Sequence, residues 1–550
     1  MKRFASLLAL LLFLSVFFVS FPQIGTVKAE TKTIVVPDDY SIIQEAVDAA
    51  SENDIVFVKS GTYNESVSID VAISLIGEDP ATTTIIGDLR LSGTVVLIRH
   101  NNVNVTGFTI QPSAYSWTRR GVHLLHVSYC NVFGNVILKN EEGIWIYGSS
   151  SNNITGNTVS GHSSGILVEC SPNNRICGNI VRNNNLGVRF IASPDNTLYN
   201  NTITNNQHGL DVASDRNNII ENTIEHNRKY GIQLSGANNI LKGNKLNNNT
   251  LNFDINPKTR IDYGNSQFAN DVDSSNTIEG KPIIFWMNKQ DQKVTADAAF
   301  VVLVNCKNII VENLNLSKNT VGIILVSTVN SKVTNNSVEV PDYGIFVYNS
   351  SGNTIANNFV FKGGIGIFLH SAFQNELIGN SITDATSGIT LEFSNANIID
   401  GNIVLGGSGG IRLDGSNNNT VRKNVVKDCK QLALTFWRNA SQNLFYLNSL
   451  INNTKNVEEY RPGFPAFPIN IWDSGIVGNF WSDYNGTDTN GDGIGDPPYV
   501  IDENNQDNYP LVEPYAIPEF PSWIILPLFL IVAVVAVIFK KRLTQSSEKL

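Results

Sequence analysis

Cysteine and methionine are scarce in this sequence, with five cysteines and two methionines among 550 residues. The cysteines are too few and too scattered for a disulfide scaffold, although Cys170 and Cys177 are close enough in the chain to pair. The seven histidines are also scattered, from His100 to His370. Copper sites need clustered His, Met or Cys ligands, so the composition argues against copper as a cofactor.

Charge is sparse as well. Only 16% of the residues are Asp, Glu, Lys or Arg, and the formal net charge is −10. No stretch gathers lysines and arginines into the basic patch that nucleic-acid binding needs. We therefore expect no nucleic acid among the partners.

Long hydrophobic runs occur only at the two ends of the chain. Residues 1–29 have the form of a secretory signal peptide, with a basic start, an apolar run and a small-residue cleavage site ending at Ala29. A second apolar run, Trp523–Phe539, is long enough for about 25 Å of helix. Basic residues follow it and would stay in the cytoplasm, so residues 516–550 predict a transmembrane anchor that leaves the rest of the protein outside the cell membrane.

Glycine, in contrast, returns every 22 residues in two series. The series are Gly121, Gly143, Gly165, Gly187, Gly209 and Gly231, and then Gly322, Gly344, Gly366, Gly388 and Gly410. The second series extends by one period upstream to Phe300 and downstream to Leu432. A fixed period of this length indicates stacked repeats, in which no unit can bury its apolar face alone.

Apolar residues alternate after each glycine, as Ile367 and Leu369 do. This period of two indicates a strand with one buried face. A second apolar pair later in each unit, such as Ile355 and Val360, leaves no room for a helix. Parallel strands with short connections form a β-helix, and such crossovers are right-handed. We therefore predict an all-β fold, a right-handed parallel β-helix solenoid with about 22 residues per coil.

Asparagine keeps the same step, for example at Asn358, Asn380 and Asn402. Asparagine tolerates the left-handed conformation of tight turns, and its side chains can also stack into ladders between coils. We expect these residues to have a structural role.

The repeats divide the chain into seven segments. In order, they are the signal peptide (1–29), an N-terminal cap with irregular coils (30–120), the first array (121–253), an inserted segment (254–299), the second array (300–453), an acidic C-terminal cap (454–515) and the transmembrane anchor with a basic tail (516–550). In the N-terminal cap, residues 40–50 place Ile43, Ala46 and Val47 on one face of an amphipathic helix. Such a helix would cover the open end of the first coil.

Several stretches resemble known β-helix proteins. Residues 34–44 (IVVPDDYSIIQ) and 58–65 (VKSGTYNE) are similar to the opening of pectin-lyase-like proteins. The two arrays and the segment 273–306 between them resemble NosD-type surface proteins, which implies a right-handed β-helix and, from the role given to that family, copper delivery to nitrous oxide reductase. Residues 518–521 resemble the archaeal Pro-Glu-Phe sorting signals, which implies that the anchor is exchanged for a lipid.

The acidic cap contains a calcium-like loop, DTNGDGIGD, at residues 488–496. Asp488, Asn490, Asp492 and Asp496 supply oxygens at positions one, three, five and nine, and a glycine at position six allows the sharp turn. Tyr499 stands where an EF-hand has its bidentate glutamate, so the motif is incomplete. We expect a structural calcium site here; the alternative is a plain acidic turn.

Outward positions of the second array should form two columns on one sheet. They are Ile324, Phe346, Phe368, Thr390, Arg412 and Leu434, beside Val326, Tyr348, His370, Glu392, Asp414 and Phe436. Glu392 and Asp414 fall on adjacent coils, which would place their carboxylates about 5 Å apart, as in a retaining glycosidase. Arg412 and His370 lie beside them, and the rings of Phe346, Tyr348 and Phe368 would offer faces for a sugar.

Three functions therefore stay open. The first is a surface-anchored protein that binds carbohydrate or another surface polymer through the two columns. The second is a polysaccharide-cleaving glycosidase or lyase, with Glu392 and Asp414 as the catalytic candidates. The third is a copper-delivery factor, which the scattered ligands disfavour. We favour binding without turnover, because no stretch matches the catalytic signatures of polygalacturonases or pectate lyases.

Overall fold

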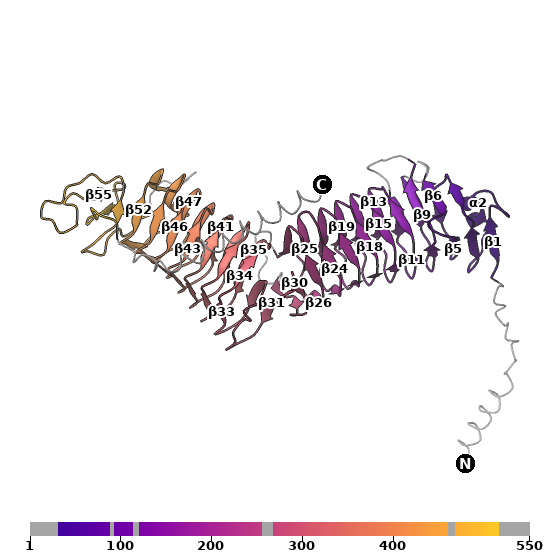
Figure 1. The fold of residues 1–550 in the computed structure, drawn as a ribbon, viewed down its shortest axis with the longest axis horizontal. Helices are drawn as coiled ribbons and strands as arrows, with labels where there is room; N and C mark the ends of the chain where they lie inside the picture. The colour runs from indigo at the N-terminus through magenta and orange to yellow at the C-terminus, as the bar shows by residue number, and fades with distance from the viewer. Residues whose placement is uncertain (1–30, 88–92, 114–119, 256–267, 460–467, 516–550) are drawn as a thin grey trace, which may run out of the picture.

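The chain folds into a long, bent rod of stacked β-coils (Figure 1). The computed structural model describes residues 31–87, 93–113, 120–255, 268–459 and 468–515. The fold is a β-solenoid of about 18 turns with about 22 residues per coil. It fits the right-handed parallel β-helix that the sequence predicts.

Each regular coil contains three short strands, one in each of three sheets. In the first array, β13 (Glu142–Tyr147), β14 (Asn153–Thr155) and β15 (Thr158–Ser160) follow one another within one coil. β13 pairs in parallel with β16 (Ser164–Glu169) of the next coil, where Ile144 lies opposite Ile166. The register therefore advances by 22 residues, as the glycine spacing predicts.

One sheet of each array lies on the inner side of the bend (Figure 1). The inner sheet of the first array contains β4 (Val67–Ile69), β7 (Thr94–Ile98), β10 (Arg120–Leu125), β13, β16, β19 (Leu186–Ile191), β22 (His208–Ala213), β25 (Tyr230–Leu234) and β28 (Leu251–Asp254). The inner sheet of the second array contains β31 (Lys281–Met287), β32 (Phe300–Val304), β35 (Val321–Val326), β38 (Tyr343–Tyr348), β41 (Ile365–His370), β44 (Ser387–Glu392), β47 (Gly409–Asp414), β50 (Leu432–Trp437) and β53 (Lys455–Glu459).

The outer sheet of each array lies on the opposite side of the rod (Figure 1). That of the first array contains β1 (Thr33–Val36), β2 (Ile55–Val58), β5 (Ser74–Gly77), β8 (Asn104–Thr106), β11 (Asn131–Phe133), β14, β17 (Arg175–Cys177), β20 (Thr197–Tyr199), β23 (Asn218–Ile220), β26 (Ile240–Lys242) and β29 (Asp271–Val272). That of the second contains β33 (Ile310–Glu312), β36 (Lys332–Thr334), β39 (Thr354–Ala356), β42 (Glu376–Ile378), β45 (Ile398–Asp400), β48 (Thr420–Arg422) and β51 (Leu444–Tyr446).

A third set of strands closes each coil. In the first array it contains β3 (Gly61–Tyr63), β6 (Thr83–Gly87), β9 (Thr109–Pro112), β12 (Val136–Leu138), β15, β18 (Ile180–Arg182), β21 (Thr202–Thr204), β24 (Thr223–Glu225), β27 (Lys245–Asn247) and β30 (Thr277–Ile278). In the second it contains β34 (Asn315–Ser317), β37 (Ser337–Glu339), β40 (Phe359–Phe361), β43 (Ser381–Thr383), β46 (Ile403–Leu405), β49 (Val425–Lys427), β52 (Ser449–Ile451) and β54 (Phe480–Trp481). A final hairpin joins β55 (Tyr499–Val500) to β56 (Gln506–Asp507).

Alternate residues of each strand fill a continuous core. In β41, Ile367 and Leu369 are fully buried. The glycine before them is required because neighbouring coils approach closely: a Cβ on Gly366 would lie 2.5 Å from Cγ2 of Ile382 and 2.6 Å from the backbone oxygen of Gly388. The glycine period therefore follows from packing between coils.

The periodic asparagines form buried ladders along the rod. The side chain of Asn380 donates to the backbone oxygen of Ile355 at 2.8 Å and to Oδ1 of Asn402 at 2.8 Å. Its own Oδ1 accepts the backbone N–H of Asn358 at 3.0 Å. The residue that adopts the left-handed conformation here is not Asn380 but the preceding residue, Gly379, with a φ of 62°. The structural role predicted for these asparagines is confirmed, and stacking is its basis.

The rod bends where the inserted segment joins the two arrays (Figure 1). β31 pairs antiparallel with β30 of the first array and in parallel with β32 of the second. Across the join, the rings of Phe253 and Phe300 lie 5.6 Å apart, and the hydroxyl of Thr320 donates to Oδ1 of Asp254 at 2.7 Å. The two arrays are therefore in direct contact at the bend.

The period slips by one residue between β47 and β50. Asp414 lies opposite Trp437, a step of 23 residues, and Ala433 takes the close-packed place that the glycine period assigns to position 432. Leu434 and Phe436 consequently point into the core and are 2% and 3% exposed. The prediction that these two residues continue the outward columns is wrong, because the 22-residue count was carried across one extra residue.

The N-terminal end of the rod carries one short helix, α2 (Ile43–Asp48), which buries Ile43, Ala46 and Val47. The carboxylate of Glu65 accepts the backbone N–H groups of Ile43 and Gln44 at 2.9 and 2.8 Å, and so satisfies the first turn. No helix among the described residues has the length and apolar character to cross a bilayer. The predicted signal peptide and the predicted anchor at residues 516–550 lie outside the described residues.

Candidate functional site

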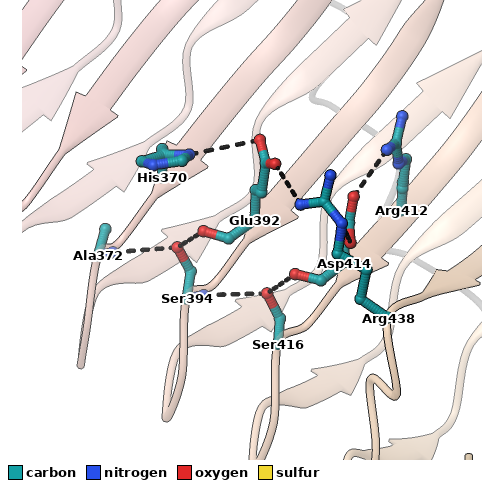
Figure 2. Close-up of polar contacts among 8 residues, drawn as sticks. All are labelled: His370, Ala372, Glu392, Ser394, Arg412, Asp414, Ser416 and Arg438. Carbon is teal, nitrogen blue, oxygen red and sulfur yellow. Dashed lines mark hydrogen bonds and ion pairs between the residues drawn. The ribbon is translucent and has the colours of Figure 1, made fainter. Parts of the chain in front are cut away.

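His370, Glu392 and Asp414 end three neighbouring strands of the second inner sheet (Figure 2). β41, β44 and β47 hold them in register, with His370 opposite Glu392 and Glu392 opposite Asp414. The prediction that these three residues share one column is therefore confirmed.

A serine ladder fixes the backbone beyond each carboxylate (Figure 2). Oγ of Ser394 accepts the backbone N–H of Ala372 at 3.0 Å and donates to the backbone oxygen of Glu392 at 2.9 Å. Ser416 repeats this arrangement one coil further, with 3.0 Å to the backbone N–H of Ser394 and 3.0 Å to the backbone oxygen of Asp414. The strand ends are thus held rigidly, which suits a preorganised site.

Arg438 joins the two carboxylates (Figure 2). Its Nη1 donates to Oε1 of Glu392 at 2.9 Å, and its Nε lies 3.6 Å from Oδ1 of Asp414. Asp414 also accepts a bond from Nη2 of Arg412 at 2.8 Å. At the other end, Oε2 of Glu392 lies 3.3 Å from Nδ1 of His370. The five side chains form one continuous polar chain across four coils.

The two acids differ in burial. The side chain of Glu392 is 24% exposed, whereas that of Asp414 is only 1% exposed. The bond from His370, and then the bond from Arg438, hold the pKa of Glu392 below its usual range despite burial. Oδ1 of Asp414 is buried and has no hydrogen-bond partner among the described residues, with Nε of Arg438 nearby. Each acid is therefore paired with a cation rather than with the other acid.

Aromatic rings surround this polar chain. Tyr348 stacks on His370 with ring centroids 5.4 Å apart, and Phe393 meets His370 edge-on at 6.0 Å. The guanidinium of Arg412 lies 3.4 Å from the ring centroid of Trp437. Phe393, next to Glu392 in the chain, is 42% exposed, with the guanidinium of Arg438 5.1 Å from its ring centroid. Apolar faces next to directional polar groups are the usual elements of a sugar site.

Two of the predicted ligand residues are not open to a ligand. Phe346 is fully buried and Phe368 is 5% exposed, and both rings pack against Tyr343, at 5.5 and 5.3 Å. The prediction that their faces stand exposed is wrong. Near the bend, these outward side chains belong to a buried apolar cluster that continues from the first array.

Arg438, Trp437 and Phe393 belong to the site but were not found from the sequence. Trp437 was missed because the one-residue slip before β50 moved it out of the counted columns. Choosing the small residue Ala433 as the glycine equivalent, instead of counting 22 positions, would have found it. Phe393 and Arg438 directly follow the strand ends at Glu392 and Trp437, outside the offsets that were compared.

The calcium-like loop is built around Asp488. Its Oδ1 accepts the backbone N–H of Gly491 at 2.7 Å, and its Oδ2 accepts that of Gly493 at 2.9 Å. Asp492 accepts the N–H of Ile494 at 2.9 Å, and Asp496 accepts that of Thr489 at 2.9 Å. Asn490 donates to Oδ2 of Asp492 at 3.0 Å. The loop is thus ordered by its own amides, and calcium binding by these residues stays a prediction.

A copper site would need His, Met or Cys side chains gathered in one place. Within the described residues, no three side chains of His, Cys, Asp or Glu come together in an arrangement that could hold a metal ion. Three of the cysteines, Cys130, Cys306 and Cys429, are buried in the core, and burial raises the pKa of each thiol. Since copper prefers clustered imidazole, thioether and thiolate ligands, the described residues do not fit a copper site.

Comparisons with known proteins identify the family of this chain. The family model described as periplasmic copper-binding protein (NosD) matches residues 83–285 and again residues 274–486. No curated protein matches the chain in sequence. Among solved structures, the Dettilon tailspike protein matches with a TM-score of 0.28 at 12% identity. The match covers 72% of this chain and 67% of the tailspike chain.

Two enzyme structures show a similarly low likeness. The catalytic domain of a GH87 α-1,3-glucanase in complex with nigerose has a TM-score of 0.34 at 13% identity and covers 67% of this chain and 66% of its own. A pectin methylesterase in complex with a hexasaccharide has a TM-score of 0.28 at 12% identity and covers 49% of this chain and 92% of its own. At scores this low, the likenesses carry no argument about function.

Proposed function

This chain belongs to the NosD family, whose model matches residues 83–285 and 274–486, and we propose that it is an exported β-helix protein. We propose further that it binds carbohydrate with the inner sheet of its second array. The observation that carries the proposal is the polar chain from His370 to Arg412, set among aromatic rings. Its carboxylates and guanidinium groups offer acceptors and donors at fixed positions for sugar hydroxyls. Tyr348 and Phe393 supply apolar faces for the sugar ring.

The ligand of this site is an uncharged or cationic sugar. Glu392 is the more accessible of the two acids, and its carboxylate would meet the incoming ligand. An anionic sugar would place a second negative charge beside it, which is unfavourable without a bridging cation.

The same geometry favours binding over cleavage. A retaining glycosidase needs one carboxyl group that stays protonated at neutral pH. Here the contacts of Glu392 lower its pKa, and Arg412 and Arg438 flank Asp414. Glu392 is therefore better suited to accept hydrogen bonds than to protonate a leaving group, and the side chain of Asp414 is only 1% exposed.

A glycan screen followed by two variants tests the proposal. Tyr348→Ala and Glu392→Gln should each raise the dissociation constant for the best uncharged glycan by roughly tenfold. The first removes a stacking contact with the sugar, and the second removes a charged hydrogen-bond acceptor. Glu376→Gln, an exposed glutamate of β42 on the outer sheet, is the matched control and should bind like the parent.

Two outcomes would count against the proposal. Unchanged affinity in both variants would show that the inner face is only a solvated sheet surface. Release of reducing ends by the parent, lost in Glu392→Gln while binding persists, would favour the polysaccharide-cleaving alternative.

The proposal also includes the two ends of the chain. Residues 1–29 would direct export, and Trp523–Phe539 would anchor the rod to the membrane, processed or not at the Pro-Glu-Phe stretch. Calcium at Asp488, Asn490, Asp492 and Asp496 would stabilise the C-terminal end of the β-helix.

A further inference from the structure

A second groove lies on the other side of the rod, on the outer sheet of the first array. It crosses five neighbouring strands, from β5 to β17, and has a volume of about 520 Å³. Strand spacing in a sheet is close to 4.8 Å, so these strands give a groove about 19 Å long. None of the residues of the proposed inner-face site lies on this surface.

One wall of the groove is a continuous column of side-chain amides. Asn153 donates to Oδ1 of Asn131 at 2.8 Å, Asn131 donates to Oδ1 of Asn104 at 2.7 Å, and Asn104 donates to Oγ of Ser74 at 2.9 Å. Unlike the buried ladders, these amides are partly or fully exposed. Each uses one of its two N–H groups in the column and has no second partner among the described residues, so one N–H per coil stays available to a ligand.

The other wall contains an exposed aromatic ring. Phe133 is 42% exposed and stands between Thr106 and Thr155 in the next column of the same sheet. An open phenyl face flanked by hydroxyl groups, opposite a row of amides, matches the two surfaces of a sugar ring: one face of C–H groups and a rim of hydroxyls.

The charge of the groove differs from that of the whole protein. The chain has a net charge of −10, yet no acidic residue lines the groove among the described residues, and Arg175 stands exposed at one end. A guanidinium group binds a carboxylate through two parallel hydrogen bonds. The local charge therefore complements an anionic ligand, in contrast to the inner face, where Glu392 is accessible.

We propose that this outer-sheet groove is a second carbohydrate site, which binds an extended glycan bearing carboxylate groups. One sugar ring stacks on Phe133, the ring hydroxyls meet the amides of Asn104, Asn131 and Asn153, and a carboxylate pairs with Arg175. The regular step between coils lets successive sugars meet equivalent amides, so affinity should rise with chain length until the groove is full.

Calorimetry on the whole protein tests the proposal, with a six-sugar oligogalacturonate and its fully methyl-esterified form as probes, both in the presence of a chelator. The chelator removes any calcium bridge to the inner face. We expect the acidic hexamer to bind more tightly than the ester. Phe133→Ala should lower the affinity for both hexamers by about tenfold, because the stacking contact is lost. Arg175→Gln should remove the preference for the acidic hexamer over its ester.

Phe359→Ala is the matched control, because Phe359 is 41% exposed on β40, outside the groove. It should bind like the parent, and all variants should keep the parent's melting temperature, since these side chains are exposed. No binding of the acidic hexamer, an equal loss in Phe359→Ala, or a preference for the acid that survives Arg175→Gln would each overturn the proposal.

The inner-face variants separate the two sites. Tyr348→Ala and Glu392→Gln should leave binding of the acidic hexamer unchanged, and a loss there would assign that ligand to the inner face and overturn the outer-sheet site. Conversely, if the inner face fails to bind uncharged glycans, the response of the hexamer to Phe133→Ala and Arg175→Gln still decides the outer-sheet proposal.

Discussion

Glu142 and Glu392 are glutamates on inner sheets whose environments shift their pKa values in opposite directions. Oε2 of Glu142 lies 3.7 Å from Nε of Arg120, and no hydrogen bond to it forms among the described residues. Burial, followed by repulsion from Glu141, raises the pKa of Glu142 to about 7. Glu392, in contrast, receives bonds from His370 and Arg438, and its pKa is lowered. The hydrogen bonds to the charged form decide the direction.

Glu142→Gln should remove a pH dependence of stability. The folded-state pKa of about 7 lies above the ordinary value of 4.5, so the folded protein holds a proton that the unfolded chain loses. The contribution of Glu142 is therefore fully present below pH 4.5 and is lost as the pH rises through about 7. Denaturant unfolding at several pH values should show a decline between these limits in the parent and a flatter profile in Glu142→Gln.

Glu392→Gln provides the comparison of opposite sign. The lowered pKa means that Glu392 stabilises the fold above its ordinary pKa, and the contribution disappears as the pH falls through the folded-state value. Glu392→Gln should be less stable to unfolding than the parent at neutral pH and equally stable in acid. Identical profiles for Glu142→Gln and the parent would contradict the pKa assigned to Glu142.

At the scale of the coil, hydrogen-bonded asparagines and close-packed glycines hold one turn on the next. Each ladder asparagine bonds to both neighbouring coils, as Asn380 does to Ile355 and Asn402. A change at one position therefore affects two interfaces.

Asn380→Ala should destabilise the fold by about 1–3 kcal/mol, because it leaves buried backbone groups of Ile355 and Asn358 without their partners. Asn315→Ala is the control, since Asn315 is exposed on β34 and should cost less than about 0.5 kcal/mol. Equal midpoints of chemical unfolding for the two variants would show that the hydrogen bonds of the asparagine ladder do not stabilise the stacking of neighbouring coils.

The coil was predictable from the sequence because its rules are local. Gly366 and Ile367 have fixed neighbours 22 positions away, so the period alone placed them correctly. The burial of Phe346 was not predictable in this way, because it depends on the packing near the bend rather than on the repeat. Trp437 was lost for a third reason: one inserted residue shifts every later member of a column, while the alternation of the strand itself stays intact.

At the scale of the whole molecule, the ends of the rod must be closed. At the C-terminal end, Trp472 and Trp481 are 3% and 1% exposed, and Trp472 stacks on Phe445 at 4.7 Å. The calcium-like loop follows these two tryptophans in the chain. Within the loop, the backbone N–H of Gly495 donates to the backbone oxygen of Pro510 at 2.8 Å. Ordering the loop therefore supports the last coils.

Calcium should raise the melting temperature of the protein, because a cation that binds only the folded loop stabilises it by mass action. The shift should appear at millimolar calcium, reverse with a chelator and disappear in Asp492→Ala. Asp297→Ala, an exposed aspartate in the inserted segment, should keep the shift. A shift that persists in Asp492→Ala would place the calcium elsewhere.

The parallel pairing between coils also determines how the rod responds to force. Hydrogen bonds between neighbouring strands lie along the long axis of a β-helix, and the covalent chain passes from one coil to the next only once per turn. Tension between the two ends therefore acts on the hydrogen bonds between coils, and the outermost coil, which has a neighbouring coil on one side only, peels first. The rod should yield in many small steps of one coil each, so that a molecule held at a surface could lengthen gradually under shear while its remaining coils keep their shape.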